Sequence, residues 1–288
     1  MRKSLEQSCD LSIQEAETEA AAILSYVLGI SRTELEIKHN HSLTSKEYEK
    51  VKNILDLRLK DNPLQYILEE AYFYGLKFKV NPSVLIPRPE TEILLEKAVE
   101  IFKSLNKKQL KVLEIGTGSG CLSVALASVL KKKGYEFKIF ATDISREALR
   151  VAKENAINNS VQEFIYFEYA DLLPKKLINQ KFDLVISNPP YISESEYLEL
   201  CSTVYKEPKL ALVGNKSPNG LEYYYQIAKL PIEWSHTVME LDPSRADKVK
   251  EIYGELGYKT ISFIKDLAKQ KRFIHIFQDI SREQMSNN

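Results

Sequence analysis

The stretch that decides the fold is "KVLEIGTGSGCLSVALASVL", residues 111–130, in which a glycine-rich segment separates two apolar runs. The run that ends at residue 115 is short and mostly apolar, which is typical of a buried strand. The leucines, valines and alanines after residue 120 favour a helix. Glycine lets the backbone turn tightly and lets a ligand lie against bare backbone. We therefore expect a ligand site beyond the end of this strand, where open α/β sheets bind their ligands.

The alternation of strand and helix continues downstream of this stretch. The runs that predict further strands are 138–143, 163–171, 182–188, 236–241, 259–266 and 272–279, and those that predict helices are 145–159, 223–230 and 244–257. Strands that alternate with helices indicate a parallel sheet covered on both faces. The last two strands are too close together for a helical crossover, so we expect the final one to insert antiparallel. The predicted fold is α/β and Rossmann-like, with a seven-stranded, mostly parallel sheet.

The N-terminal quarter of the chain has a helical pattern instead. Asp10 or Ser12 can cap a first helix, and Gly29 is placed to end it. Thr44 and Glu47 have the spacing of a capping box before a second amphipathic run. These signals predict a small helical bundle.

A hairpin and a proline-rich segment follow the helical part. From residue 71 apolar and polar residues alternate, with Gly75 at a turn position, and "NPSVLIPRPE" then reads as a hinge. The predicted division is a helical substrate-guiding domain at 1–74, a hairpin and linker at 75–90, and the α/β domain at 91–288.

Composition limits the class of protein. Forty basic and forty acidic residues cancel among 288, so the chain as a whole carries no charge that would attract a polyanion. The first ten residues, "MRKSLEQSCD", lack the apolar core of a signal peptide, and the longest apolar segment nearby is too short to span a bilayer. We expect a cytoplasmic protein without membrane association.

Cysteine and histidine give no strong metal or disulfide signal. Cys9, Cys121 and Cys201 are far apart in sequence and form no C-x-x-C pair, which argues against a disulfide framework or a zinc site. His39 and His41 have a spacing that can hold a metal, but a helix or loop surface is the favoured interpretation.

The glycine spacing favours one class of cofactor. It is G-x-G-x-G here, whereas dinucleotide-binding folds carry G-x-G-x-x-G with a helix N-terminus against the pyrophosphate. S-adenosylmethionine has no pyrophosphate, so its loop only has to let an amino acid and a ribose approach. Glu114 lies just before the loop and can meet the ligand's ammonium group directly or through water. The predicted cofactor loop comprises Gly116, Thr117, Gly118, Ser119 and Gly120.

Two further acids follow strands. Asp143 ends "FATD", where a carboxylate can accept hydrogen bonds from both ribose hydroxyls, although a strand-end Asp alone is usually a cap or loop residue. Asp171 in "YADLL" can accept from the adenine amino group while Leu172 packs on the ring. A turn-forming role for Asp171 remains the alternative.

The segment "SNPPY" ends the fourth predicted strand. Its two prolines fix the backbone, so Asn188 and the carbonyl of Pro189 can face one spot in a set geometry. Two neutral acceptors can hold both hydrogens of a planar –NH₂ group and favour a pyramidal nitrogen in a transition state. Pro190 completes the rigid pair, and Tyr191 would lie over the planar amide or base. A plain proline turn is the alternative.

Several motifs together resemble the HemK/PrmC family of glutamine methyltransferases. They are "VLIPRPETE", "LEIGTGSG", "ATDIS" followed by "AL" and "ENA", "SNPPYI" and "EPKLAL", which run in order from about Asn62 to Phe277. The resemblance implies methylation of the Gly-Gly-Gln loop of class-1 peptide release factors. It implies that the glycine loop and Asp143 bind S-adenosylmethionine, that residues 188–191 hold the substrate glutamine, and that Asn188 also touches the cofactor. Residues 86–90 would form part of a lip over the site.

Some positions depart from the family pattern. After "EPKLAL" the family shows G-G-x-D-G, whereas "VGNKSPNGLEYY" is longer here and lacks the acid. Asp242 and Arg245 replace an expected Gly and Gln, and Glu69 stands where a Gly is usual. These departures concern outer substrate contacts and loop shape.

Other functions remain open at this point. An adenine amino group is also a planar –NH₂ compound, so the same clamp would serve a nucleic-acid methyltransferase. Zero net charge and a modest helical domain argue against direct nucleic-acid binding. A relative that methylates a glutamine of a ribosomal protein fits the same motifs, and a non-catalytic binding module is the weakest alternative.

Overall fold

A computed structural model describes residues 1, 3, 5, 11–37, 42–105, 107–214 and 219–278. The predicted features at Cys9, Asp10, His39 and His41 lie outside these residues. The chain forms two compact units, Met1–Glu70 with Cys201–Lys206, and Ala71–Leu200 with Glu207–Asn288. The three-part division at residues 74 and 90 stays a prediction.

The first unit contains helices packed around a small apolar core. Its helices are α2 (Ile13–Leu28), α3 (Arg32–Ile37), α4 (Ser45–Arg58) and α5 (Leu64–Leu68). Ser12 caps α2 in a capping box with Glu15, and Thr44 does the same for α4 with Glu47. Gly29 ends α2 in the left-handed conformation, at φ 65°. The predicted caps at Ser12 and Thr44 and the stop at Gly29 are therefore confirmed.

A two-stranded hairpin follows, with β1 (Glu70–Phe73) and β2 (Leu76–Lys79). The turn residues Tyr74 and Gly75 both have positive φ, 50° and 73°. Two such residues in a two-residue turn are typical of type I′, whose twist suits a hairpin. The predicted hairpin with Gly75 in its turn is confirmed.

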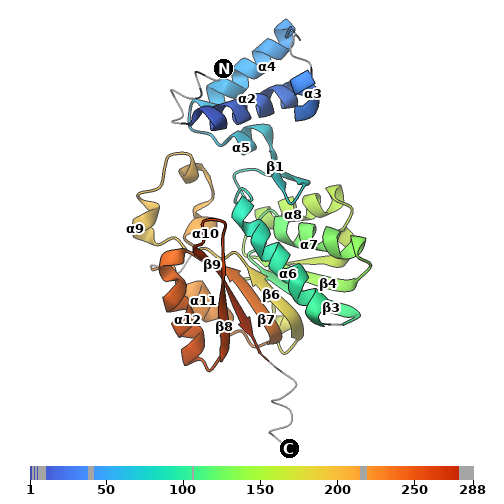
Figure 1. Ribbon diagram of the computed structural model, residues 1–288, viewed down its shortest axis with the longest axis vertical. Coiled ribbons are helices and arrows are strands. Elements are labelled where there is room, and N and C mark those ends of the chain that lie inside the picture. The colour runs from blue at the N-terminus through green and yellow to red at the C-terminus, as the bar shows by residue number, and fades with distance from the viewer. Residues whose placement is uncertain are drawn as a thin grey trace, which may run out of the picture. The chain divides into compact units, whose positions relative to one another are not determined.

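The second unit is built on a seven-stranded sheet (Figure 1). Its strands are β3 (Gln109–Ile115), β4 (Glu136–Asp143), β5 (Ile165–Tyr169), β6 (Lys181–Ser187), β7 (Glu233–Glu240), β8 (Thr260–Lys265) and β9 (Lys271–Phe277). The order is β5-β4-β3-β6-β7-β9-β8, with β9 antiparallel to both of its neighbours and the other pairs parallel. The strand order reverses between β3 and β6, which is where doubly wound sheets bind ligands.

Helices cover both faces of this sheet (Figure 1). The longer ones are α6 (Glu92–Leu105), α7 (Cys121–Lys132), α8 (Arg146–Asn158), α11 (Glu222–Ala228) and α12 (Ala246–Glu255), and the short ones are α9 (Glu194–Tyr197) and α10 (Lys209–Leu212). Single turns of 3-10 helix are η1 (Pro89–Thr91), η2 (Gln162–Phe164), η3 (Lys175–Leu177), η4 (Val204–Lys206) and η5 (Pro243–Arg245). Among the described helices none is long and apolar enough to cross a membrane.

The alternation of side chains along the strands separates two apolar cores. Leu110 and Val112 of β3 belong to the cluster that includes α6 and α7, whereas Leu113 and Ile115 belong to the cluster of α11 and α12. A central strand that is buried on both faces explains why the sequence before the glycine loop is mostly apolar.

Two pairs of stacked rings involve residues of β7. Trp234, which is 3% exposed at the start of β7, stacks on Tyr258 with ring centroids 5.1 Å apart. His236 of β7 and His275 of β9 also stack, and His236 Nδ1 lies 3.0 Å from His275 Nε2. Both pairs depend on contacts between segments that are distant in sequence.

Candidate active site

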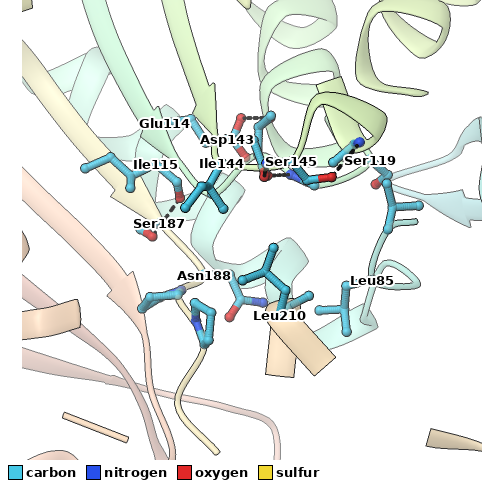
Figure 2. Close-up of a pocket in the computed structure, with 18 of the residues that line it drawn as sticks. Leu85, Glu114, Ile115, Ser119, Asp143, Ile144, Ser145, Ser187, Asn188 and Leu210 are labelled. Carbon is cyan, nitrogen blue, oxygen red and sulfur yellow. Dashed lines mark hydrogen bonds between the residues drawn. The ribbon is translucent and has the colours of Figure 1, made fainter. Parts of the chain in front are cut away.

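A cavity of about 340 Å³ opens where β3, β4 and β6 end. Nearly all of the predicted site residues line it: Glu114, Gly116, Thr117, Gly118, Ser119, Asp143, Asp171, Leu172, Asn188, Pro189 and Pro190. Gly120 and Tyr191 do not. Figure 2 shows Asp143, Ser145 and Ser119 on one side of the space and Asn188 and Leu210 on the other.

The glycine loop folds back onto the end of β4. The amides of Gly116 and Thr117 both donate to the carbonyl of Thr142, each at 2.9 Å. Gly116 and Gly118 have φ of 72° and 55°, and a Cβ atom at either position would meet open space. The loop therefore presents bare backbone to the cavity, as a ligand that lies close to it requires.

A glycine is needed at residue 120 for a different reason, the close packing of two helices. Gly120 precedes α7 at φ 76°, and a Cβ atom there would lie 2.9 Å from the Cβ of Ala152 on α8. This position allows α7 and α8 to approach closely. A direct contact of Gly120 with a cofactor stays a prediction.

Asp143 holds the backbone of two segments. Its Oδ2 accepts from the Gly118 amide and its Oδ1 from the Ser145 amide, both at 2.8 Å. Burial raises the pKa of Asp143, and these backbone donors oppose the rise because they favour the carboxylate. Asp143 therefore lines the cavity and shapes the loop at the same time, and its contact with a ribose stays a prediction.

Glu114 is buried beneath the loop and lines the cavity. Its Oε2 accepts from the hydroxyl of Thr117 at 2.7 Å and from that of Ser123. Burial raises its pKa to about 7, against the effect of these two donors. The carboxyl group thus supports the loop from within, and its predicted contact with a ligand ammonium stays a prediction.

Asp171 and Leu172 line the cavity from the loop after β5. The strand ends at Tyr169, so Asp171 lies two residues beyond it. Leu172 has a positive φ of 70°, and its carbonyl accepts from the Thr142 hydroxyl at 2.8 Å. This bond fixes a conformation that is uncommon for a branched residue. The roles predicted for both residues toward adenine stay predictions.

The Asn-Pro-Pro segment follows β6 on the opposite side of the cavity. The Ser187 hydroxyl donates to the Ile115 carbonyl at 2.8 Å, which ties the ends of β6 and β3 together. Asn188 Nδ2 donates to the Thr91 hydroxyl at 3.4 Å, and no described residue donates to Asn188 Oδ1. Pro189 and Pro190 line the cavity beside it.

Tyr191 turns toward the protein interior. Its hydroxyl donates to Glu240 Oε1 at 3.3 Å, and its ring packs against the core of α11 and α12. Burial raises the pKa of Tyr191, so the phenol is a neutral donor. Stacking of its ring on the substrate amide stays a prediction.

Sequence reasoning missed a buried carboxyl group behind Asn188. Glu240, at the end of β7, is 2% exposed, and its Oε2 accepts from the Thr91 hydroxyl at 2.7 Å. Burial raises its pKa, while the donors Thr91 and Tyr191 and the nearby charge of Arg272 lower it. The sequence pattern places Glu240 within the predicted strand 236–241 and gives it no further role.

Glu207 connects two segments that line the cavity. Its Oε2 accepts from the Ile86 amide at 3.0 Å, and its Oε1 accepts from Arg88 Nη2 at 2.5 Å. Ile86 and Arg88 belong to the predicted lip, and Pro208 lines the cavity on the other segment. The motif "EPKLAL" contains this residue, but no local pattern shows that its acid points back to the lip.

Asn155 of α8 holds the glycine loop from behind. It is fully buried, and its Oδ1 accepts from the Lys79 amide at 2.7 Å. Its Nδ2 donates to the carbonyls of Lys79 and Ser119, both at 2.9 Å. One side chain thus joins β2, α8 and the loop.

Asp242 and Arg245, which depart from the family pattern, form a local brace after β7. Arg245 Nε donates to the Asn219 carbonyl at 3.1 Å, and its Nη2 pairs with Glu196. Asp242 accepts from the Ser244 amide at 2.9 Å and so caps η5. A Cβ on Gly220 would lie 2.2 Å from the Tyr191 carbonyl. The brace therefore packs directly against the end of the Asn-Pro-Pro-Tyr segment.

Models of two protein families match separate parts of this chain. A methyltransferase domain model matches residues 106–240, and a model of the PrmC N-terminal domain matches residues 2–68. A release factor glutamine methyltransferase from Chlorobaculum tepidum is 38% identical over 271 residues, which cover 90% of each chain. Another from Dictyoglomus turgidum is 41% identical over 222 residues, covering 77% of this chain and 75% of that one.

Solved structures support the fold. The N-terminal domain of human METTL16, in complex with SAH, aligns with a TM-score of 0.51 at 17% identity, over 78% of this chain and 83% of that chain. The predicted Rossmann-like methyltransferase fold is confirmed. Because identity to the Chlorobaculum tepidum enzyme extends over nine-tenths of both chains, this chain belongs to the family of release factor glutamine methyltransferases.

Proposed function

We propose that this enzyme transfers a methyl group from S-adenosylmethionine to the side-chain amide nitrogen of a glutamine in a peptide chain release factor. The Gly-Gly-Gln motif of class-1 factors is the substrate segment we expect. One observation carries the proposal: a single cavity has the glycine loop and Asp143 on one side and the Asn-Pro-Pro segment on the other (Figure 2). Donor and acceptor of a methyl group would therefore meet in one enclosed space.

The cavity walls fit the cofactor. Gly116 and Gly118 leave space next to bare backbone, and Asp143 offers carboxylate oxygens beside that space. We propose that these residues hold the amino acid and ribose parts, with Asp171 and Leu172 at the adenine. When bound, S-adenosylmethionine supplies an electrophilic methyl group on a sulfonium.

Asn188 is the catalytic residue that we propose. A glutamine amide nitrogen is a poor nucleophile, because its lone pair is delocalised into the carbonyl group. Asn188 Oδ1 and the carbonyl of Pro189 would accept its two hydrogens and favour the pyramidal nitrogen of the transition state. A strong base is not needed, since the proton leaves after the nitrogen has been methylated. The two prolines keep both acceptors in place without cost at the moment of reaction.

The test is Asn188→Ala, assayed in single-turnover methylation at saturating S-adenosylmethionine. We expect the chemical step to slow by roughly 10²–10³, the scale for loss of one preorganised polar partner. Asn188→Asp keeps an acceptor but loses the donor to Thr91, and should also lose most activity with the fold retained. An unchanged chemical step with weaker peptide binding alone would mean that Asn188 only positions the segment.

The substrate class is tested by assaying methylation of a panel of protein and DNA substrates. We expect a release factor to be methylated by the enzyme far faster than a ribosomal protein or adenine-containing DNA, because the motifs and family point to a protein glutamine. Release factors act in the cytoplasm, so we also place the enzyme there. Adenine methylation at a comparable rate would favour the nucleic-acid alternative.

A further inference from the structure

Three side chains that are distant in sequence form one hydrogen-bonded row beside the cavity. Asn188 Nδ2 donates to Thr91 Oγ1 at 3.4 Å, and Thr91 Oγ1 donates to Glu240 Oε2 at 2.7 Å. Thr91 is 4% exposed and Glu240 2% exposed, so both of these side chains lie away from solvent. Thr91 and Asn188 also line the cavity, so the row ends at the proposed catalytic residue.

The number of hydrogens in this row decides the direction of each bond. A carboxylate can only accept, and a threonine hydroxyl has a single hydrogen to donate. That hydrogen points at Glu240, so only lone pairs of Thr91 remain for Asn188. The side of the Asn188 amide that faces Thr91 must then be its –NH₂ group, which leaves Oδ1 for the other side.

Glu240 is surrounded so that both of its oxygens accept. Thr91 donates to one and the Tyr191 hydroxyl to the other, at 3.3 Å. Burial raises the pKa of Glu240 and is the largest effect on it, while Arg272 favours the carboxylate and Glu90 disfavours it. Two donors and a cation suit an ionised carboxyl group, even though it is buried.

We propose that Thr91 and Glu240 are positioning residues that hold the Asn188 amide with its oxygen available to the substrate –NH₂. The inference rests on the proposed function, in which Asn188 Oδ1 accepts a substrate hydrogen. The two ends of an asparagine amide have nearly the same shape, so packing alone selects poorly between them. A turned amide would present donors to the donors of the glutamine, and the clamp would fail.

The test compares variants of nearly the same shape in the full-length enzyme. Thr91→Val removes the hydroxyl and keeps the branched side chain, whereas Thr91→Ser keeps the hydroxyl. We expect Thr91→Val to lower the single-turnover rate roughly tenfold, the scale of one hydrogen bond, and Thr91→Ser to restore most of it. The Kd for S-adenosylmethionine and the KM for the release factor should stay close to those of the unmodified enzyme in both variants.

Two further variants separate orientation from simple packing. Glu240→Gln keeps the size of the side chain but can turn its –NH₂ group toward Thr91, so the row can reverse and the rate should also fall. Adding Thr91→Val to Asn188→Ala should cause no further loss, because Thr91 acts only through Asn188.

Different results would overturn the positioning role of Thr91 and Glu240 and the catalytic role of Asn188. Equal rates for Thr91→Val and Thr91→Ser, additive losses in the double variant, or a fully active Glu240→Gln would each overturn the positioning role while Asn188→Ala remains slow. If Thr91→Val does not fold, Glu240→Gln and the serine variant decide alone. A fully active Asn188→Ala instead removes the proposed catalytic role, whatever Thr91 does.

Discussion

Asp143 both lines the cavity and shapes the glycine loop. Its carboxylate accepts from the amides of Gly118 and Ser145, so it arranges the loop that lines the cavity. Asp143→Ala should weaken binding of S-adenosylmethionine by about 1.5–3 kcal/mol, the scale of a lost hydrogen bond to a charged group. Calorimetric titration measures this directly.

Asp143→Asn is the matched control for that substitution. It keeps one oxygen acceptor and the size of the side chain but removes the charge. We expect its affinity to lie between those of the alanine variant and the unmodified enzyme. Unchanged affinity in the alanine variant would restrict Asp143 to a structural role.

The backbone conformation at Glu69 accounts for the glycine that is usual at this position in the family. Glu69 ends α5 in the left-handed conformation, with φ 55°. Glycine adopts this conformation without the steric cost that a Cβ atom adds. The backbone geometry is therefore the one that suits glycine, although this chain carries a glutamate there.

The lining residues of the cavity were predictable where a local pattern marks them. The glycine loop and Asn188 directly follow apolar strands and Asp143 ends one, so sequence places them at the same edge of the sheet. Other residues carry no such mark. Thr91, for example, bonds to Glu240 149 positions away, and Glu207 bonds to the Ile86 amide 121 positions away. Only the completed fold brings such partners together.

At the scale of elements, the pairing of β7 with β9 contains a pH-sensitive contact. Burial lowers the pKa of both His236 and His275 to about 4, and for His275 the neighbouring ring adds to this. Between about pH 6.5 and 4 the unfolded chain binds protons that the folded chain does not. Stability should therefore fall as the pH falls through this window.

Urea unfolding at several pH values checks this expectation. Lys97, Lys107 and Asp183 also act on His236, so the comparison needs a variant that changes only the imidazoles. In His236→Gln/His275→Gln the slope of unfolding free energy against pH between 6.5 and 4 should be smaller. The raised pKa values of buried acids act in both proteins and cancel in the difference. An equal slope would contradict the prediction.

Asn155 is the point where β2, α8 and the glycine loop are joined. Asn155→Ala would leave the Lys79 amide and the Lys79 and Ser119 carbonyls without this partner. We expect a loss of about 1–3 kcal/mol in the free energy of unfolding and weaker binding of S-adenosylmethionine, because the loop loses a support. Urea unfolding and calorimetry measure the two effects.

Asn159 offers a control one helical turn further along. Its Nδ2 donates to the Lys77 carbonyl at 3.2 Å and so contacts the same hairpin, but it has no bond to the loop. Asn159→Ala should affect stability mildly and leave cofactor affinity unchanged. Equal effects of the two variants on affinity would argue against a specific support of the loop by Asn155.

Most strands and longer helices of the second unit were predictable. The antiparallel insertion of β9 is confirmed, because the short connection between β8 and β9 excludes a helical crossover. Helix α6 was missed, although its buried residues Leu94, Ala98 and Ile101 follow helical spacing. It begins directly after the proline-rich segment, whose composition is typical of a linker and gives no signal for the start of a helix.

At the scale of the whole molecule, the cavity belongs to the second unit. Every residue that lines the cavity lies in it, and its two apolar cores are built from its own elements. We expect a chain that starts at Ala71 to bind S-adenosylmethionine with nearly the affinity of the full-length enzyme. It should methylate an intact release factor slowly, since the helical unit is expected to guide the substrate.

A short glutamine peptide is the control substrate for that comparison. It has no surface for a guiding unit to bind, so both chains should methylate it at similar rates. Methylation of the intact factor at full rate by the shortened chain would show that the helical unit has no guiding role.

The stacked ring of Trp234 has a practical consequence for all of these measurements. The chain contains a single tryptophan, and it is buried in the second unit against Tyr258. Its emission should shift to longer wavelength when that unit opens and the indole meets water, and should be insensitive to melting of the helical unit alone. Circular dichroism records the helices of both units. A gap between the two unfolding curves would therefore report how independently the two parts of the enzyme lose their structure.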